Sequence, residues 1–222
     1  MKALQMRKNL TRGYLFTFCG LDGCGKTTMI QRLEAWLKQQ GKPVLLTRQP
    51  TDAVRNSAIF RTYMDQPDHR RYDYRSLSML AAADRIQHVN KEIYPAMQEG
   101  KIVLSDRYFY SCLANLLGRG YERDRWIYEA ASFVLQPDAA FFLDISVEEA
   151  IARVRQRAEE KERYIHESLQ YRLRDFYIEI ARKNKGILLS TAEDEEKTFE
   201  TIKKTVQKCL EENRNGYKKR RL

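Results

Sequence analysis

The stretch Tyr14-Leu-Phe-Thr-Phe-Cys19, followed at once by Gly20-Leu-Asp-Gly-Cys-Gly-Lys-Thr-Thr28, decides the fold of this 222-residue chain. The apolar run predicts a buried strand. Residues 26–40 then carry apolar side chains on one helical face, and Gly41 ends the helix. The segment between them fits the pattern G-x-x-x-x-G-K-[ST], in which backbone N–H groups surround phosphate oxygens. This order predicts an α/β fold built around a phosphate site.

The positions of this loop have separate predicted roles. The glycines let N–H groups turn inward, and the helix N-terminus adds partial positive charge. Lys26 would reach the β- and γ-phosphates of ATP, and Thr27 would ligate Mg²⁺. The residues predicted to bind the ATP phosphates are Gly20, Asp22, Gly23, Cys24, Gly25, Lys26, Thr27 and Thr28. We therefore expect a phosphotransferase that uses MgATP.

The rest of the chain alternates strands with helices. Further strands are predicted at 43–47, 102–105, 139–144 and 186–190. Helices are predicted at 52–63, 73–98 with a bend before Pro95, 110–117, 124–135, 163–183 and 194–213, and one capped by Ser146 that carries Arg153, Arg155 and Arg157. Such alternation favours a three-layer fold, with a five-stranded parallel sheet flanked by helices. We expect one domain over residues 1–222.

Composition narrows the class of protein. The chain is 43% hydrophobic and 32% charged, which is typical of a globular domain. No apolar run approaches the roughly 18 residues of a membrane span, and we expect a cytoplasmic protein. The four cysteines form no CxxC pair, so reduced thiols are expected. The net charge of +10 suits an enzyme that holds two phosphorylated substrates, and the basic tail, residues 214–222, adds to it.

Several motifs, in order, resemble the thymidylate kinase family. They are the loop with Asp22, Thr47-Arg-Gln-Pro50, Ala83-Asp-Arg-Ile-Gln-His88, Asp106-Arg-Tyr-Phe-Tyr-Ser111, and the arginines 153, 155, 157 and 163. The resemblance covers nearly the whole chain. It implies a nucleoside monophosphate kinase that transfers the γ-phosphoryl group of ATP to dTMP. It also implies a homodimer and a short arginine-rich lid at about residues 152–164.

The resemblance also implies roles for single residues. Arg48 and Arg85 would contact the acceptor base or its phosphate, and Arg107 would contact the acceptor phosphate. Asp22 would contact the acceptor sugar or organise the site. Asp106 would hold Mg²⁺ together with Thr27. The residues expected to act in catalysis are Lys26, Arg107, Asp22, Arg153 and Arg157. Those expected to bind the acceptor are Asp22, Arg48, Ala81, Arg85, Arg107, Ser111 and Asn115.

Three positions depart from the family pattern, and all three bear on the acceptor. Ala81 stands where family members usually carry a phenylalanine that stacks on thymine, a contact worth roughly 1–3 kcal/mol per base. Asn115 stands where they carry a tyrosine thought to crowd a ribose 2′-hydroxyl. Gln49 replaces the usual glutamate, which would remove a charge near the acceptor. A roomier pocket for another nucleotide, or for another phosphorylated acceptor, is the alternative to dTMP.

Two readings from other classes of protein remain open. The charge of +10 could recruit the chain to nucleic acid, although no basic stripe interleaved with aromatic residues supports this. Alternatively, Ala81 and Asn115 could mark a relative that binds ATP without turning over an acceptor. The intact loop, Arg107 and the lid arginines argue against that second reading.

Overall fold

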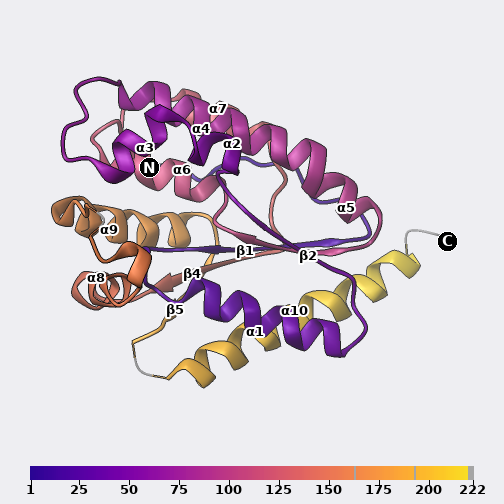
Figure 1. Cartoon of the computed structure of the whole chain (residues 1–222). Coiled ribbons are helices and arrows are strands. Elements are labelled where there is room, and N and C mark those ends of the chain that lie inside the picture. The colour runs from indigo at the N-terminus through magenta and orange to yellow at the C-terminus, as the bar shows by residue number, and fades with distance from the viewer. Residues whose placement is uncertain (163, 193, 220–222) are drawn as a thin grey trace.

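A parallel five-stranded sheet forms the centre of the molecule (Figure 1). The computed structural model describes residues 1–162, 164–192 and 194–219, with side chains placed up to residue 212. The strands are β1 (Tyr14–Cys19), β2 (Val44–Arg48), β3 (Ile102–Asp106), β4 (Ala139–Asp144) and β5 (Ile187–Ser190), in the order β2-β3-β1-β4-β5. The predicted three-layer α/β fold and its five strands are confirmed.

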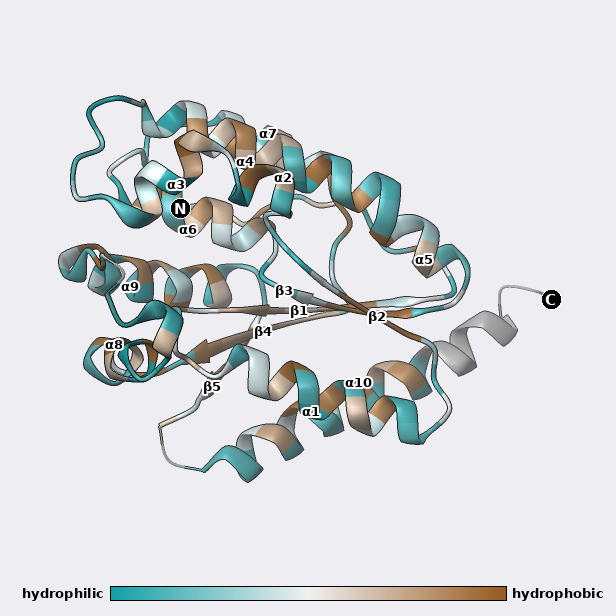
Figure 2. Ribbon diagram, in the orientation of Figure 1, coloured by the Kyte–Doolittle hydropathy of each residue, from teal (hydrophilic) through white to brown (hydrophobic). Residues whose placement is uncertain are grey.

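Helices cover both faces of the sheet (Figure 1). On one face lie α1 (Lys26–Gln39) and α10 (Glu195–Lys219). Above the other lie α2 (Asp52–Arg55), α3 (Ala58–Asp65), α4 (Tyr74–His88), α5 (Tyr94–Gln98), α6 (Phe109–Gly118), α7 (Trp126–Ala130) and α9 (Glu167–Lys183), while α8 (Val147–Arg155) follows β4 near α9. The apolar sides of the helices turn toward the sheet (Figure 2).

The central strands are buried from both sides. Phe16 and Phe18 of β1, and Phe141 of β4, have no exposed surface. A strand inside a parallel sheet has a helix layer on each face, so its apolar residues form a run rather than an alternation. This explains why the sequence reveals β1 and β4 so clearly.

Several predicted helices are wrong in their extent. The helix predicted at 73–98 is divided by a π-helical turn, Val89–Ile93, which comes before Pro95 as the expected bend did. Proline lacks an N–H group and its ring crowds the preceding turn, and a wider turn accommodates both. The helix predicted at 52–63 is two short helices, and that at 124–135 is α7 with a 3₁₀ turn, Ala131–Phe133.

The lid also differs from its prediction. Ser146 caps α8, as its capping-box spacing indicates. However, α8 ends at Arg155, so Arg157 lies beyond it and precedes a 3₁₀ turn at Ala158–Glu160. The next helix begins at Glu167 rather than at 163, and Arg163 lies outside the described residues, as does the tail beyond 219. Over the described residues, no helix is long and apolar enough to cross a membrane.

Strand register brings the functional segments to one edge. Asp106 at the end of β3 pairs with Phe18 of β1 on one side and with Arg48 of β2 on the other. The glycine-rich loop, the segment after β2 and Arg107 therefore leave the sheet at the same level. Ligands of open α/β sheets bind at these carboxyl ends.

Candidate active site

The loop after β1 is held in the shape that its glycines allow. Gly23 and Gly25 have φ values of 86° and 87°, which side chains rarely adopt. A Cβ on Gly23 would lie 2.2 Å from the carbonyl oxygen of Ala150, so the loop also packs tightly against α8. Lys26 is the first residue of α1 and is buried. Its Nζ donates to the carbonyl oxygens of Leu21 at 2.6 Å and Gly20 at 3.3 Å.

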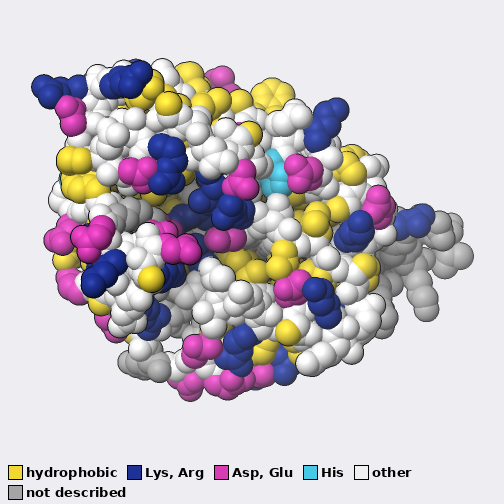
Figure 3. All heavy atoms as spheres, viewed as in Figure 1, with side chains coloured by type: hydrophobic (Ala, Val, Ile, Leu, Met, Phe, Trp, Pro, Cys, Tyr) yellow, Lys and Arg dark blue, Asp and Glu magenta, His cyan; other side chains and the backbone are white. Residues whose placement is uncertain are grey.

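A cavity of about 610 Å³ opens beside this loop at the carboxyl ends of β1, β2 and β3. Basic side chains gather around a hollow on this face of the molecule (Figure 3). The predicted site residues that line the cavity are Gly20, Asp22, Gly23, Gly25, Lys26, Thr27, Arg48, Ala81, Arg85, Asp106, Arg107, Ser111, Asn115 and Arg157. Cys24, Thr28 and Arg153 are not on its wall. The phosphate loop and the predicted acceptor residues thus share one cavity.

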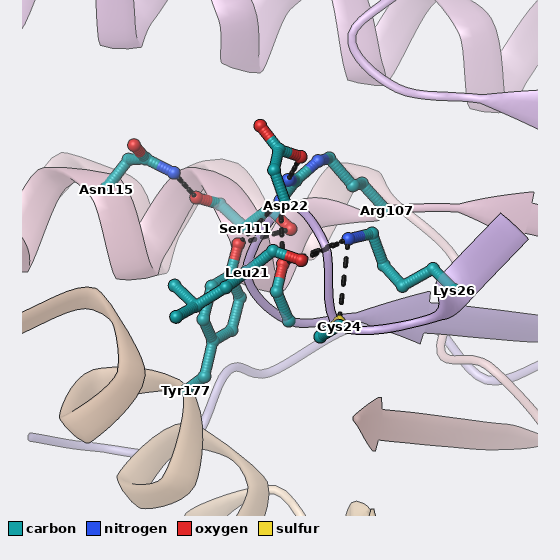
Figure 4. A network of polar contacts seen from close by, with 9 residues as sticks. Leu21, Asp22, Cys24, Lys26, Arg107, Ser111, Asn115 and Tyr177 are labelled. Carbon is teal, nitrogen blue, oxygen red and sulfur yellow. Dashed lines mark hydrogen bonds and ion pairs between the residues drawn. The ribbon is translucent and has the colours of Figure 1, made fainter. Parts of the chain in front are cut away.

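Arg107 is the most constrained charge in the cavity (Figure 4). Its φ is 66°, in the left-handed region, and the Ser105 hydroxyl donates to its carbonyl oxygen at 2.7 Å. Its Nη2 donates to Asp22 Oδ1 at 2.5 Å, and its Nη1 donates to Gly20 O and to the Tyr177 hydroxyl. Burial opposes the charge, but Tyr177, Asp22 and Asp106 raise the pKa of Arg107 well above its ordinary value. Arg107 is a fixed cation.

Asp106 and Thr27 offer oxygen ligands in the same cavity. The Oδ1 atom of Asp106 is buried and has no hydrogen-bond partner, which is costly for a carboxylate oxygen. The Thr27 side chain is exposed at the start of α1. Over the described residues, no group of three or more His, Cys, Asp or Glu side chains could hold a metal. One carboxylate and one hydroxyl suit Mg²⁺, which completes its shell with phosphate oxygens and water.

Three more arginines line the cavity, and two of them, Arg48 and Arg85, are predicted to contact the acceptor. Arg85 of α4 is buried, and its Nη1 donates to the carbonyl oxygen of Ala81 at 2.8 Å. Arg48 is exposed and forms an ion pair with Asp52. Arg55, which sequence reasoning missed, also lines the cavity, and its Nε donates to the carbonyl oxygen of Pro50 at 2.8 Å. Burial, and then the charges of Arg107 and Arg48, lower the pKa of Arg55, because the cavity concentrates positive charge.

The three departures from the family pattern fall in different places. Ala81 and Asn115 line the cavity from α4 and α6, and Asn115 Nδ2 donates to the carbonyl oxygen of Ser111. Gln49 does not line it. Its side chain is fully buried and bonds His88 Nδ1 at 3.0 Å, because the chain turns inward after β2. The expected loss of a charge beside the acceptor at Gln49 is therefore wrong.

The lid arginines separate in the structure. Arg157 lines the cavity, together with Glu159, Glu160 and Glu162, which sequence reasoning missed. Arg153 Nη2 donates instead to the carbonyl oxygen of Thr191, after β5, at 3.2 Å. Arg155 Nη1 donates to the carbonyl oxygen of Lys161 at 2.5 Å, which closes the segment on itself. Of these three arginines, Arg157 therefore lines the cavity, whereas Arg153 and Arg155 donate to backbone carbonyl oxygens.

Tyr177 is a further cavity residue that sequence reasoning missed. It lies on α9 and lines the cavity with Leu169 and Leu173, at intervals of four residues. That spacing is indistinguishable in sequence from an apolar helix face packed in the core. Its hydroxyl donates to Ser111 Oγ at 3.0 Å, so it links α9 to α6.

Comparisons with known proteins agree with this geometry. The family model of thymidylate kinase matches residues 18–202. A probable thymidylate kinase of Pyrococcus horikoshii is 39% identical over 172 residues, which cover 77% of this chain and 83% of that protein. A thymidylate kinase of a Geobacillus species is 37% identical over 78% of this chain and 84% of its own. One from Bifidobacterium longum subsp. infantis is 32% identical over 90% and 89%, respectively. With the phosphate loop and the acceptor arginines around one cavity, this chain belongs to the thymidylate kinase family.

Proposed function

We propose that this protein transfers the γ-phosphoryl group of MgATP to dTMP and releases dTDP and ADP. One observation carries the proposal: a single cavity is lined by Lys26 of the phosphate loop and by Arg107, Arg85 and Arg48 on the acceptor side. Phosphoryl transfer requires mainly positioning and neutralisation of two anions, and this wall supplies both. The matching relatives, named as thymidylate kinases, support dTMP as the acceptor.

The residues would divide the reaction between them. The loop from Gly20 to Thr28 binds the ATP phosphates, with Lys26 on the β- and γ-phosphates. Arg107, fixed by Asp22, holds the acceptor phosphate in line with the transferred group. Arg157, on the lid at about residues 152–164, closes over the phosphates and excludes water. Arg153 has the same assignment, although it is not on the cavity wall and its Nη2 donates to the carbonyl oxygen of Thr191.

Mg²⁺ would be held by Thr27 and Asp106, directly or through water. The buried, unpartnered Oδ1 of Asp106 supports this assignment. When bound, the ion neutralises charge on the β- and γ-phosphates. The protein's own contribution is to keep one carboxylate at the end of β3, at the level of the phosphate loop.

Two residues of the cavity wall favour a second class of acceptor, a nucleoside monophosphate other than dTMP. Ala81 and Asn115 leave the cavity without the two rings that the family pattern would place there. A nucleoside monophosphate with a larger base or a 2′-hydroxyl is therefore the alternative to dTMP.

The setting of the protein is also proposed. We infer a homodimer in the cytoplasm, with residues 1–222 acting as one kinase domain and no role for nucleic acid. The four cysteines, which are free thiols in the structure, support a reducing compartment.

A coupled assay of ADP release tests the proposal, with dTMP, dUMP, UMP and other monophosphates supplied separately. We expect dTMP to raise the rate far above that with ATP alone. The variant Lys26→Ala should lose at least about a hundredfold in kcat, because a donor to the transferred phosphate is removed. If no monophosphate raises ADP release above the acceptor-free rate, the proposal is wrong. Turnover of UMP at the rate of dTMP would instead favour the second acceptor class.

A further inference from the structure

The Tyr177 hydroxyl uses both of its hydrogen-bonding functions inside the cavity wall (Figure 4). It accepts from Arg107 Nη1 at 2.9 Å and donates to Ser111 Oγ at 3.0 Å. Arg107 can only donate, so the direction of the hydrogen bond to Tyr177 is fixed.

This chain of hydroxyls is shielded from water. Tyr177 is 4% exposed and Ser111 2% exposed. Burial raises the pKa of Tyr177, so its hydroxyl is protonated at neutral pH and can donate a hydrogen bond to Ser111. Hydrogen bonds between such weakly exposed groups hold their geometry well, because little water competes for the partners.

Arg107 needs support from more than one side. Its backbone is in the left-handed region, and its guanidinium group lies between Asp22 of the phosphate loop and Tyr177 of α9. The Asp22 carboxylate and the Gly20 carbonyl oxygen hold the group from the side of the loop. Tyr177 is the only side chain of α9 with a hydrogen bond to Arg107 among the described residues. Its contact sets how far the guanidinium group stands from the loop.

Helix α9 also connects this contact to the lid. It begins at Glu167, directly after the lid segment, and its cavity face runs from Leu169 and Gln170 to Tyr177. A rigid helix therefore borders the cavity at both the lid end and the Arg107 end.

We propose that Tyr177 is a positioning residue for the transfer reaction. Its hydroxyl holds the Arg107 guanidinium group in the orientation needed to bind the acceptor phosphate, and it anchors that group to helix α9. The inference rests on the proposed function. Arg107 touches the acceptor, and Tyr177 acts through it. The phenol ring alone, without the hydroxyl, does not supply this role.

The variant Tyr177→Phe tests it, since only the hydroxyl is removed. We expect kcat/KM for dTMP to fall about tenfold to hundredfold, because small misplacements of a positioned group have effects of that size. The KM for ATP should stay within about twofold, since the phosphate loop is untouched. Tyr108→Phe is the matched control: that hydroxyl is fully buried and donates to the Leu135 carbonyl oxygen at 2.7 Å, outside the cavity wall.

A double-mutant cycle separates positioning from stability. Affinity for dTMP, measured by calorimetry, should fall with Tyr177→Phe in the wild-type background and stay unchanged in an Arg107→Ala background. Equal losses in both backgrounds, or a kcat/KM within twofold of wild type with only a lower melting temperature, would overturn the inference. If Tyr177→Phe does not fold, Ser111→Ala removes the acceptor of the same hydroxyl. Because Ser111 also lines the cavity, its loss of affinity for dTMP supports the inference only if it disappears in the Arg107→Ala background, and a loss that persists there would overturn it. A wild-type protein without turnover of any monophosphate would refute the proposed function itself.

Discussion

Ala81→Phe is the substitution with the clearest consequence for substrate binding. Ala81 is half-buried on the cavity wall, one helical turn before Arg85. Side chains on a helix point toward its N-terminus, so a phenyl ring there would extend over Ser78, which also lines the cavity, and away from Arg85. The ring would add a stacking surface at this position of the wall, where Ala81 offers none.

The size of the effect follows from stacking energies. A base stacked on an aromatic side chain gains roughly 1–3 kcal/mol. At 1.4 kcal/mol per tenfold, the dissociation constant for dTMP should fall by about 5-fold to 150-fold. The cost to the helix of replacing alanine is only about 0.5 kcal/mol, so the fold should persist.

Calorimetric titration with dTMP measures this, alongside the KM for dTMP in the coupled assay. Ala83→Phe is the control, because Ala83 is exposed on the same helix and is not on the cavity wall. It carries the same helix cost without the stacking gain. A folded Ala81→Phe protein whose affinity for dTMP is unchanged or lower would refute the placement of the base against Ala81.

Three further predictions concern the ends of β2 and β3. Asp106→Asn should raise the Mg²⁺ concentration for half-maximal rate about 10-fold to 100-fold, measured by Mg²⁺ titration at fixed ATP. Ser105→Ala removes the donor to the Arg107 carbonyl oxygen and should lower the free energy of unfolding by about 1–2 kcal/mol in urea. Burial lowers the pKa of His88, so the unfolded chain binds more protons below about pH 6.5 and stability falls as the pH drops. His88→Gln should flatten the pH dependence of the melting temperature between about pH 7 and pH 5.

The sequence predicts the sheet and the phosphate loop well, because both depend on local patterns. An apolar run, a glycine-rich turn and a helix with one apolar face are readable in order from Tyr14 to Gly41. Arg107 and Arg85 are also predicted as site residues, and both line the cavity. Helix ends are less predictable where proline or a polar connection intervenes, as at Pro95 and in the lid.

Other features depend on contacts that no local pattern encodes. Arg55 lines the cavity, and its Nε donates to the carbonyl oxygen of Pro50 in the turn after β2. This contact holds the side chain in place. Gln49 turns inward to His88, although its neighbour Arg48 faces the cavity. Arg153 and Arg157 are both basic and one turn apart in spacing, yet the end of α8 at Arg155 sends them to different partners. Where a helix or strand ends, tertiary packing decides in which direction the next side chains point.

The register across β1, β2 and β3 has a consequence for biosynthesis. Arg107 bonds Asp22, which lies 85 residues earlier in the chain, and Tyr177, which lies 70 residues later. A nascent chain that has not yet produced α9 contains the phosphate loop and Arg107, but not the Tyr177 hydroxyl that Arg107 bonds in the folded protein. Parallel strands pair slowly, since distant segments must meet first. The contact between Arg107 and Tyr177 can therefore form only after α9 has been synthesised, late in the making of the chain.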